Sequence, residues 1–234
     1  MTEFMTGLLA LAIAIILHEL AHGAVAYWLG DDTAQRAGRL SLNPIKHIDK
    51  TGSIILPLVL AVGQMITVGR VAFLYGWAKP VPVDPGQLHV GRYRSPRRLM
   101  AVVALAGPAM NFLLAILAGL AMHMAITMQS PIFLMFLVRF MQINLVLGLF
   151  NLIPFPPLDG GRIAVGILPR PAAIRLARLE KIGIAAILLL LFILPLVLQQ
   201  LNIRFDPLNT VLNYVVDWAT NFILVLTGNN VGNS

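Results

Sequence analysis

The sequence predicts an all-α polytopic membrane protein with about five to six transmembrane helices, one re-entrant segment and a small membrane-associated β element. Of its 234 residues, 58% are hydrophobic and only 12% are charged, whereas a soluble domain is about 45–50% apolar and about 25% charged. Most of the 17 Lys and Arg residues lie in three loops between long apolar runs. This distribution is typical of a protein oriented by its cytoplasmic charge and does not suggest a nucleic-acid partner.

No shift in composition marks off a separate soluble domain. We expect a single integral membrane domain over 1–234, with a core over about 1–165 and two further helices over about 182–226. The chain contains no cysteine. Disulfides and thiolate ligands are therefore excluded, and any metal must be held by His and carboxylate side chains.

The first helix is predicted from about Phe4 to Leu29, with Gly30 as its C-terminal cap. Because an α-helix has 3.6 residues per turn, His18 and His22 lie one turn apart on nearly one face and can hold one Zn²⁺. Glu19 beside them can take a proton from a zinc-bound water, as the HExxH motif of metalloproteases requires. Ionisable groups in a membrane span are costly, which favours a functional role for all three.

The region after the first helix is predicted to contain the β element. Gly38 to Asn43 alternates as a short strand does, and Val71 to Tyr75 has the composition of a strand. The prolines of Pro80 to Val83 suit a sheet edge. The apolar run within 53–75 is short for a span and is interrupted by proline and glycine, so we expect this segment to be re-entrant.

Further helices are predicted in the rest of the chain. A second long helix is expected from about Leu99 to Met128 and a third from about Ile132 to Phe150, where a proline-rich stretch must break it. A basic loop follows as far as Lys181. Two helices over about 182–201 and 208–226 complete the chain.

The basic loops set the expected orientation. If 53–75 is re-entrant, the loops at 31–52, 76–98 and 162–181 all fall on one side, which the positive-inside rule makes cytoplasmic. A spanning segment would place the last two loops outside, against that rule. The re-entrant topology also brings Asp159 to the same cytoplasmic half of the membrane as the HExxH motif.

Asp159 is the candidate third metal ligand. A catalytic zinc site usually has three protein ligands and leaves a fourth position for water. Asp159 is the only acidic residue between Asp84 and Glu180. The alternative is that Leu158 to Gly161 forms a plain surface turn, in which Asp-Gly is common.

These residues strongly resemble the motifs of the site-2 protease family of intramembrane zinc metalloproteases. The family's HExxH is matched by 18–22, and its NxxPxPxLDG is matched in full from Asn151 to Gly160. A third feature, Gly-Pro-x-x-Asn in the intervening helix, is matched by Gly107, Pro108 and Asn111. The chain looks like the compact prokaryotic branch, which has neither a PDZ nor a CBS domain.

The resemblance implies the site and its chemistry. His18, His22 and Asp159 would bind one Zn²⁺, and Glu19 would be the catalytic base of a zinc metalloendopeptidase. The resemblance also supports a membrane-associated β element between the first two core helices.

Four other residues are candidates to bind substrate. Asn111 and Asn151 could hydrogen-bond the substrate backbone or the oxyanion, and the alternative for both is packing between helices. A helical substrate must unwind before cleavage, and an exposed strand edge could pair with the unwound segment. We expect Val71 and Phe73 to lie on that edge, with Arg39 to Asn43 as a second candidate.

We therefore expect a multi-pass cell-membrane protein that hydrolyses peptide bonds within or near transmembrane segments, as in regulated intramembrane proteolysis. Its active site would face the cytoplasmic side, and its partners would be a transmembrane protein or peptide substrate and the lipid bilayer. The alternative is a membrane metal-ion transporter that uses the same His and Asp side chains. A transporter should carry polar residues across the whole bilayer, whereas the outer half of the first helix is apolar.

Overall fold

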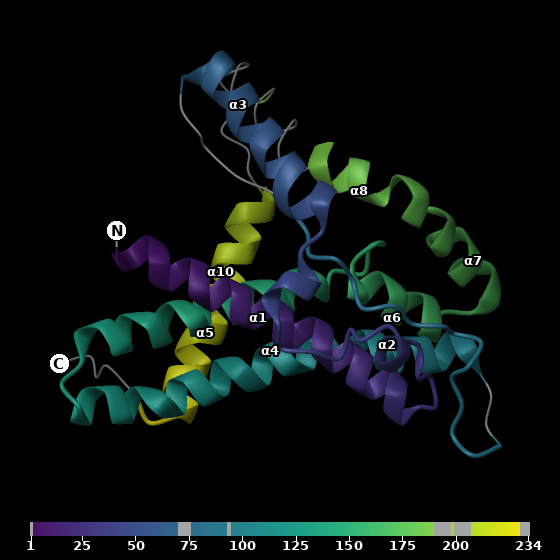
Figure 1. The fold of residues 1–234 in the computed structure, drawn as a ribbon, viewed down its shortest axis with the longest axis horizontal. Helices are drawn as coiled ribbons and strands as arrows, with labels where there is room; N and C mark the ends of the chain where they lie inside the picture. Colours follow the sequence, from purple (N-terminus) through teal and green to yellow (C-terminus); the bar gives the residue numbers. More distant parts are fainter. Residues whose placement is uncertain (1, 70–75, 93–94, 190–197, 199–206, 230–234) are drawn as a thin grey trace.

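The computed structural model describes residues 2–69, 76–92, 95–189, 198 and 207–229. Within these residues the chain is mostly helical and forms no β-sheet (Figure 1). The elements are α1 (Thr2–Trp28), α2 (Thr33–Arg36), the 3₁₀ turn η1 (Pro44–His47), the π-helical turn η2 (Lys50–Ile55), α3 (Leu56–Val68), α4 (Pro96–Thr127), α5 (Pro131–Asn151), α6 (Asp159–Ile167), α7 (Arg170–Arg178), α8 (Glu180–Leu188) and α10 (Pro207–Leu226).

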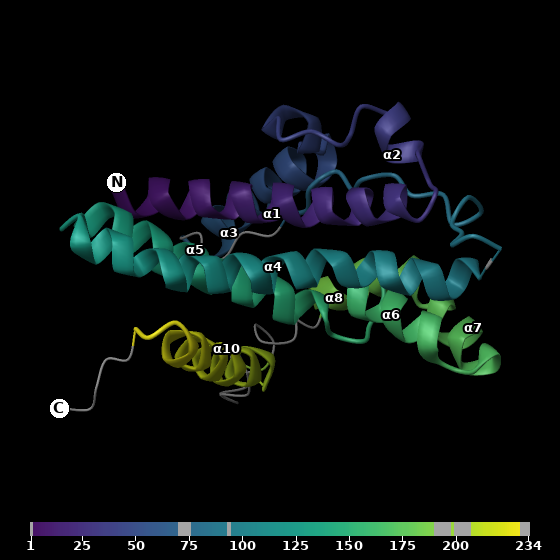
Figure 2. The same ribbon diagram turned by 90° about the horizontal axis from the view of Figure 1, so that it is seen from below.

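Three long helices form the body of the molecule. α1, α4 and α5 are each long and apolar enough to cross a membrane, and they pack against one another (Figure 2). Small side chains are prominent among the residues buried in this body, including Ala10, Ala14, Ala115 and Ala118. Small residues let helices approach closely in a bilayer, where no hydrophobic force drives helices together. The three long helices predicted from the sequence are confirmed, with ends shifted by only a few residues.

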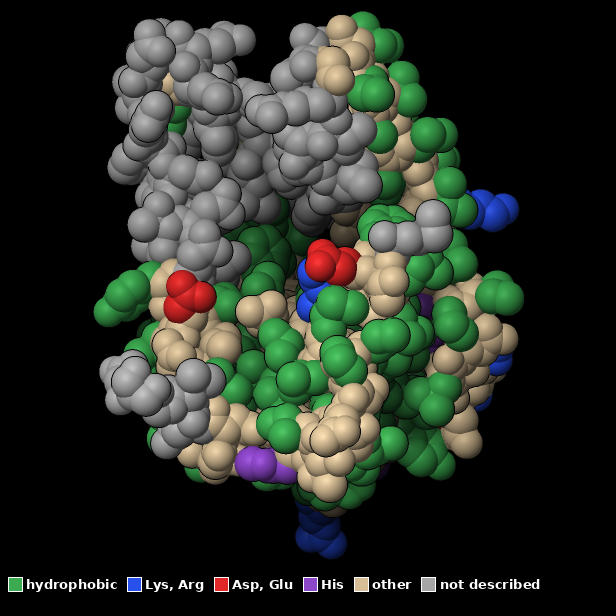
Figure 3. Space-filling view, turned by 90° about the vertical axis from the view of Figure 1, so that its left-hand side faces the viewer, with side chains coloured by type: hydrophobic (Ala, Val, Ile, Leu, Met, Phe, Trp, Pro, Cys, Tyr) green, Lys and Arg blue, Asp and Glu red, His purple; other side chains and the backbone are tan. Residues whose placement is uncertain are grey.

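Large hydrophobic side chains cover much of the outer surface. Leu8, Leu113, Leu117 and Ile132 are among those exposed. On the face where the α4–α5 connection lies, hydrophobic side chains predominate over charged ones in the described part of the surface (Figure 3). Apolar surface of this extent is expected where the surrounding solvent is lipid. The protein is therefore a membrane protein with three candidate spans in the described residues, and the predicted total of five to six spans stays a prediction.

The predicted β element is not found in the described part of the chain. Gly38 to Asn43 is irregular, because its backbone bonds locally: Arg39 N–H donates to Ala34 O (2.9 Å) and Asn43 N–H donates to Ser41 Oγ (3.3 Å). The stretch from Pro80 to Val83 is not part of a strand either. The other predicted strand, Val71 to Tyr75, lies outside the described residues.

The stretch predicted as a basic loop before Lys181 is helical. It contains α6 and α7 and the start of α8. On α7, Ala173 is buried while Arg175 and Arg178 are exposed. The arginines mark the exposed face of an amphipathic helix, which the density of charge alone does not distinguish from a loop.

The apolar segment between the first two long helices is also helical. It folds as η2 followed by α3, and α3 projects away from the body (Figure 1). With 13 residues, α3 is shorter than the roughly 20 residues needed to cross a bilayer.

Candidate metal centre

α1 brings the two predicted histidines into the body. The side chain of His18 is 7% exposed and that of His22 is 11% exposed. The next residue, Gly23, lies against two other segments: a Cβ there would be 2.5 Å from Leu40 Cδ2 and 2.8 Å from Val81 Cγ1. Glycine at this position therefore lets both segments pack directly on α1 beside the histidines.

α6 brings Asp159 to the same place. The chain turns sharply after α5 and folds back onto the start of α6, so that a Cβ on Gly160 would collide with the carbonyl oxygens of Leu152 and Ile153. A Cβ on Gly161 would collide with Pro156. The two glycines after Asp159 are thus required by the close approach of this loop, and Asp159 begins the helix instead of sitting in a surface turn.

The side chains of His18, His22 and Asp159 converge. Asp159 Oδ2 lies 3.1 Å from His18 Nε2 and 3.2 Å from His22 Nε2, and the two Nε2 atoms lie 3.0 Å apart. A tetrahedral zinc ion with bonds of about 2.0–2.1 Å separates its ligand atoms by about 3.3 Å. The triangle therefore fits one zinc ion with only slight widening.

Each imidazole makes a hydrogen bond through Nδ1, so that the lone pair of its Nε2 is directed toward the point where the three side chains converge. His22 Nδ1–H donates to the carbonyl of Val103 (2.8 Å), and His18 Nδ1–H donates to Asn111 Oδ1 (2.6 Å). Each Nε2 is then left with a lone pair, which faces the other Nε2 and a carboxylate oxygen. Three electron-rich atoms at this spacing repel one another without a cation between them, so the donor set fits a bound metal.

The carboxyl of Asp159 is ionised in this setting. Burial raises its pKa, but without a metal ion the hydrogen bonds from His18 and His22, in the form that carries a proton on Nε2, outweigh that effect and hold the pKa below its usual range. Asp159 is thus in the carboxylate form that binds metal.

α4 crosses directly over the converging histidines at Gly107. A Cβ at this position would collide with Nε2 of both His18 and His22. Any other residue at 107 would place a carbon atom where the metal-binding atoms meet. In the sequence Gly107 stands out only as part of the Gly-Pro-x-x-Asn motif, because the steric demand on it comes from a different helix.

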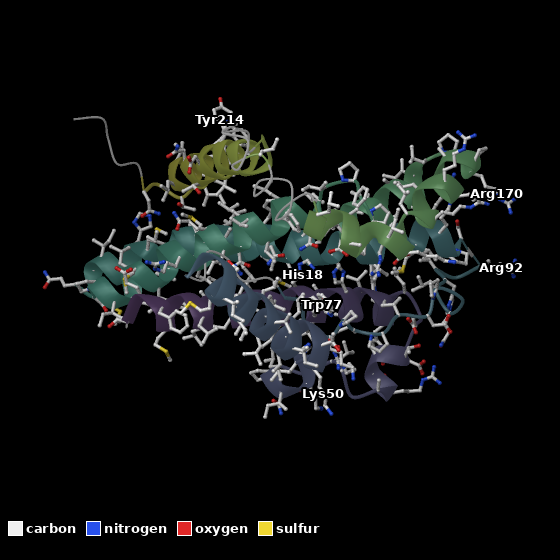
Figure 4. All side chains as sticks on the ribbon, turned by 90° about the horizontal axis from the view of Figure 1, so that it is seen from above. His18, Lys50, Trp77, Arg92, Arg170 and Tyr214 are labelled. Carbon is white, nitrogen blue, oxygen red and sulfur yellow. The ribbon has the colours of Figure 1, made fainter. Side chains whose placement is uncertain are left out.

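Glu19 lines a cavity of about 390 Å³ next to this centre. The cavity is also lined by side chains of α4, α5 and α6 and by the segment 76–83, whose Trp77 lines the same cavity as His18; both residues are labelled in Figure 4. Asp159 and both histidines open onto the same cavity. A reacting group bound there would reach Glu19 and the metal-binding atoms together.

The segment 76–83 also binds Glu19 directly. Val81 N–H donates to Glu19 Oε2 (2.9 Å). Because the neighbours Pro80 and Pro82 have no N–H, Val81 carries the one backbone donor of this tripeptide. Arg39 holds the segment in place by donating to Lys79 O (2.7 Å). The sequence signal for this contact is the Pro-Val-Pro spacing, which by itself suits a sheet edge.

The other predicted site residues lie in different places. Asn151 lines the cavity and donates to Leu147 O (3.0 Å). Asn111 does not line the cavity; it is fully buried behind His18. Val71 and Phe73 lie outside the described residues.

A buried His-His-Asp group beside a glutamate, set among helices long enough to cross a membrane, defines the class of membrane-embedded zinc metalloproteases. Comparison with known proteins identifies the family. Residues 120–194 match the model of Peptidase family M50. The chain belongs to this family, and it is a zinc metalloprotease of the site-2 protease type that uses a single Zn²⁺.

Two curated relatives support this assignment. "Putative zinc metalloprotease YwhC" of Bacillus subtilis (strain 168) is 37% identical over 196 residues, which cover 80% of this chain and 80% of the relative. "Putative zinc metalloprotease Rip2" of Mycolicibacterium smegmatis is 28% identical over 153 residues, which cover 63% of this chain and 51% of that protein. No solved structure matches the chain significantly.

Proposed function

We propose that this metalloprotease hydrolyses peptide bonds within or near transmembrane segments of other membrane proteins, as in regulated intramembrane proteolysis. The observation that carries this proposal is the position of the His-Glu-x-x-His motif. It lies inside α1, a helix long and apolar enough to cross a membrane, and it opens onto a cavity between α1 and two other such helices. A peptide bond that reaches this cavity comes from a segment at membrane depth.

In this proposal His18, His22 and Asp159 hold the zinc ion, and Glu19 is the catalytic base. Bound zinc supplies a Lewis acid that polarises a peptide carbonyl and lowers the pKa of water toward about 7. Glu19 accepts the proton of the attacking water and returns it to the leaving amine. The hydrogen bond from Val81 N–H keeps the Glu19 carboxylate facing the cavity. Asn151, which lines the cavity, would hydrogen-bond the substrate backbone.

A transmembrane substrate must be locally unwound to reach this centre. Its carbonyl groups are hydrogen-bonded within a helix, and the cavity of about 390 Å³ holds only a short extended segment. The polar groups of the unwound segment need partners at membrane depth. An edge containing Val71 and Phe73 remains our candidate for supplying them by strand pairing.

We further propose a multi-pass topology with the active site toward the cytoplasm. α1 would run inward, α4 outward and α5 inward, and the segment 53–75, which includes α3, would enter and leave on the cytoplasmic side. The charge distribution supports this orientation, since Arg92 and Arg170 lie at the same end of the molecule (Figure 4). The core over about 1–165 would carry the catalytic site, with the helices over about 182–226 packed beside it.

Cleavage in reconstituted vesicles tests the proposed function. The zinc-loaded protein is incubated with a panel of single-span proteins carrying tags at both ends, and the product masses locate the cut. We expect cleavage within or beside the span, loss of cleavage after zinc is removed with a chelator, and recovery when zinc is added back. Cleavage confined to soluble tags contradicts the proposal. Zinc flux across the same vesicles without cleavage supports the transporter alternative.

The contact between Val81 and Glu19 leads to a separate prediction. Val81→Pro removes the N–H that donates to Glu19 Oε2, whereas Val81→Ala keeps this donor and shortens only the side chain. A hydrogen bond to a charged group contributes about 1.5–3 kcal/mol, so Val81→Pro should slow cleavage about 10- to 100-fold with zinc content unchanged. Val81→Ala should stay much closer to wild type. Equal rates for the two variants would show that the donor does not position Glu19.

A further inference from the structure

A chain of buried amides links His18 to α5. His18 Nδ1 lies 2.6 Å from Asn111 Oδ1, and Asn111 Nδ2 donates to Asn144 Oδ1 (2.8 Å). Asn144 Nδ2 in turn donates to the carbonyl of Phe140, one turn earlier on α5 (2.8 Å). Both asparagines are 0% exposed. Because unsatisfied buried amides are costly, this pairing across α4 and α5 is a strongly constrained arrangement.

The last hydrogen bond, between Asn144 and the Phe140 carbonyl, determines the direction of all the others in this series. A backbone carbonyl can only accept, so the amino group of Asn144 must face Phe140 and its oxygen must face Asn111. Asn111 must then donate with its amino group and present its own oxygen to His18. His18 can meet that oxygen only with a proton on Nδ1, which leaves the Nε2 lone pair for the metal.

The close packing of α4 against α5 keeps Asn111 and Asn144 within hydrogen-bonding distance. Gly148 of α5 lies against α4, where an added Cβ would be 3.3 Å from Asn111 Cβ and 3.5 Å from Pro108 O. The small residue allows the two helices to come close enough for the Asn111 and Asn144 side chains to bond directly. The orientation of the His18 imidazole therefore depends on the position of α5, through the side-chain amides of Asn111 and Asn144.

We propose that Asn144, acting through Asn111, is a positioning residue that holds His18 in the Nδ1–H tautomer and orients its Nε2 toward the metal. This inference rests on the proposed role of His18 as a zinc ligand. It reassigns Asn111 from the substrate-contacting role expected from the sequence to the support of a ligand, because both ends of its amide are already occupied.

His22 provides an internal control in the same centre. Its Nδ1–H donates to the backbone carbonyl of Val103 on α4 (2.8 Å), a contact that includes neither asparagine. Changes at Asn144 should therefore alter His18 and leave the Nδ1–H of His22 in place, whereas a general loosening of the bundle would alter both.

The test measures zinc release and the histidine protons in the purified, zinc-loaded full-length protein without substrate. In Asn144→Leu, zinc release to a chelator should be about 10-fold faster or more, as for other partners that orient metal ligands. The ¹⁵N-detected Nδ1–H signal of His18 should shift, and that of His22 should not. In Asn144→Asp, a neutral carboxylic acid accepts from Asn111 and donates to Phe140 O, so zinc release should stay close to the wild-type rate.

Two further variants separate positioning from a merely structural role. Asn144→Ser can still bond to the Phe140 carbonyl but is too short to reach Asn111; it replaces the leucine variant if that variant does not fold, and the same fast release is expected. In an Asn111→Leu background, Asn144→Leu should add nothing to the release rate, since the link is already cut.

The inference is overturned if folded Asn144→Leu or Asn144→Ser releases zinc at the wild-type rate, if the two substitutions act additively, or if the His22 signal shifts as much as that of His18. None of these readouts requires proteolysis. A protein that binds zinc but cleaves nothing would contradict the proposed function and leave this inference standing.

Discussion

Replacing Glu19 by Gln is expected to lower the rate of cleavage by about 10³-fold, because a general base of this kind contributes about 10²- to 10⁴-fold. Gln has nearly the same shape, and its side-chain oxygen can still accept the Val81 N–H that binds Glu19 Oε2. The amide cannot take a proton from the attacking water. Zinc content should therefore stay at the wild-type level while cleavage is lost.

The matched control for this variant is Glu3→Gln on the same helix. Glu3 lies 15 residues before His18 in the printed sequence, is exposed, and pairs with Arg139 (3.0 Å). An exposed ion pair contributes about 0–1 kcal/mol, so this change should leave cleavage nearly unaffected. Cleavage by Glu19→Gln at the rate of Glu3→Gln would rule out Glu19 as the base, and loss of zinc from Glu19→Gln would indicate a ligand instead.

Gly107→Ala is the second change with a very large expected effect. Its methyl group would collide with Nε2 of both His18 and His22, and α4 cannot easily withdraw because it packs against both α1 and α5. One imidazole must then turn away, which removes a metal-binding atom. We expect zinc content near zero and cleavage below detection, measured by metal analysis of the purified protein and by the vesicle assay.

Gly7→Ala is the control for a glycine-to-alanine change within a long apolar helix. A Cβ at Gly7 meets nothing within 4 Å, so this variant should bind zinc and cleave as the wild type does. Thermal unfolding of the zinc-free proteins separates loss of the metal from loss of the fold, since Gly107→Ala should unfold near the wild-type temperature when both lack zinc. Full zinc occupancy in folded Gly107→Ala would contradict the steric argument.

Much of the body could be predicted from the sequence because it depends on local patterns. Long uncharged runs are sufficient to predict α1, α4 and α5, since helix length and apolar composition decide whether a segment can cross a bilayer. The one-turn spacing of His18 and His22 places them on one helical face before any tertiary contact forms. Asp159 could be proposed as a ligand only from its motif and from its expected depth in the membrane, which is similar to that of His18 and His22. The structure brings its carboxylate within 3.2 Å of both histidines.

Two predictions that the structure contradicts rest on the patterns of short stretches. Gly38 to Asn43 alternates in polarity, but a strand needs a partner strand, and here the backbone bonds are made locally. The many arginines of α7 suggest a loop when only their number is considered. The helical period places them on the exposed face of an amphipathic helix. For Asn111 the sequence leaves two candidate partners, the substrate and a neighbouring helix, because a polar side chain in an apolar helix requires a partner that the sequence alone does not identify.

The sequence by itself determined which residues are candidates for the chemistry and that His18, Glu19 and His22 share one long helix, because the spacing of HExxH and the composition of that run are properties of short stretches. Only the tertiary structure decided how those residues are held. Gly107 leaves space for the imidazoles, Val81 donates to Glu19, and Asn144 reaches His18 through Asn111. Each of these contacts joins helices or loops far apart in the chain, and its geometry exists only once those segments pack together.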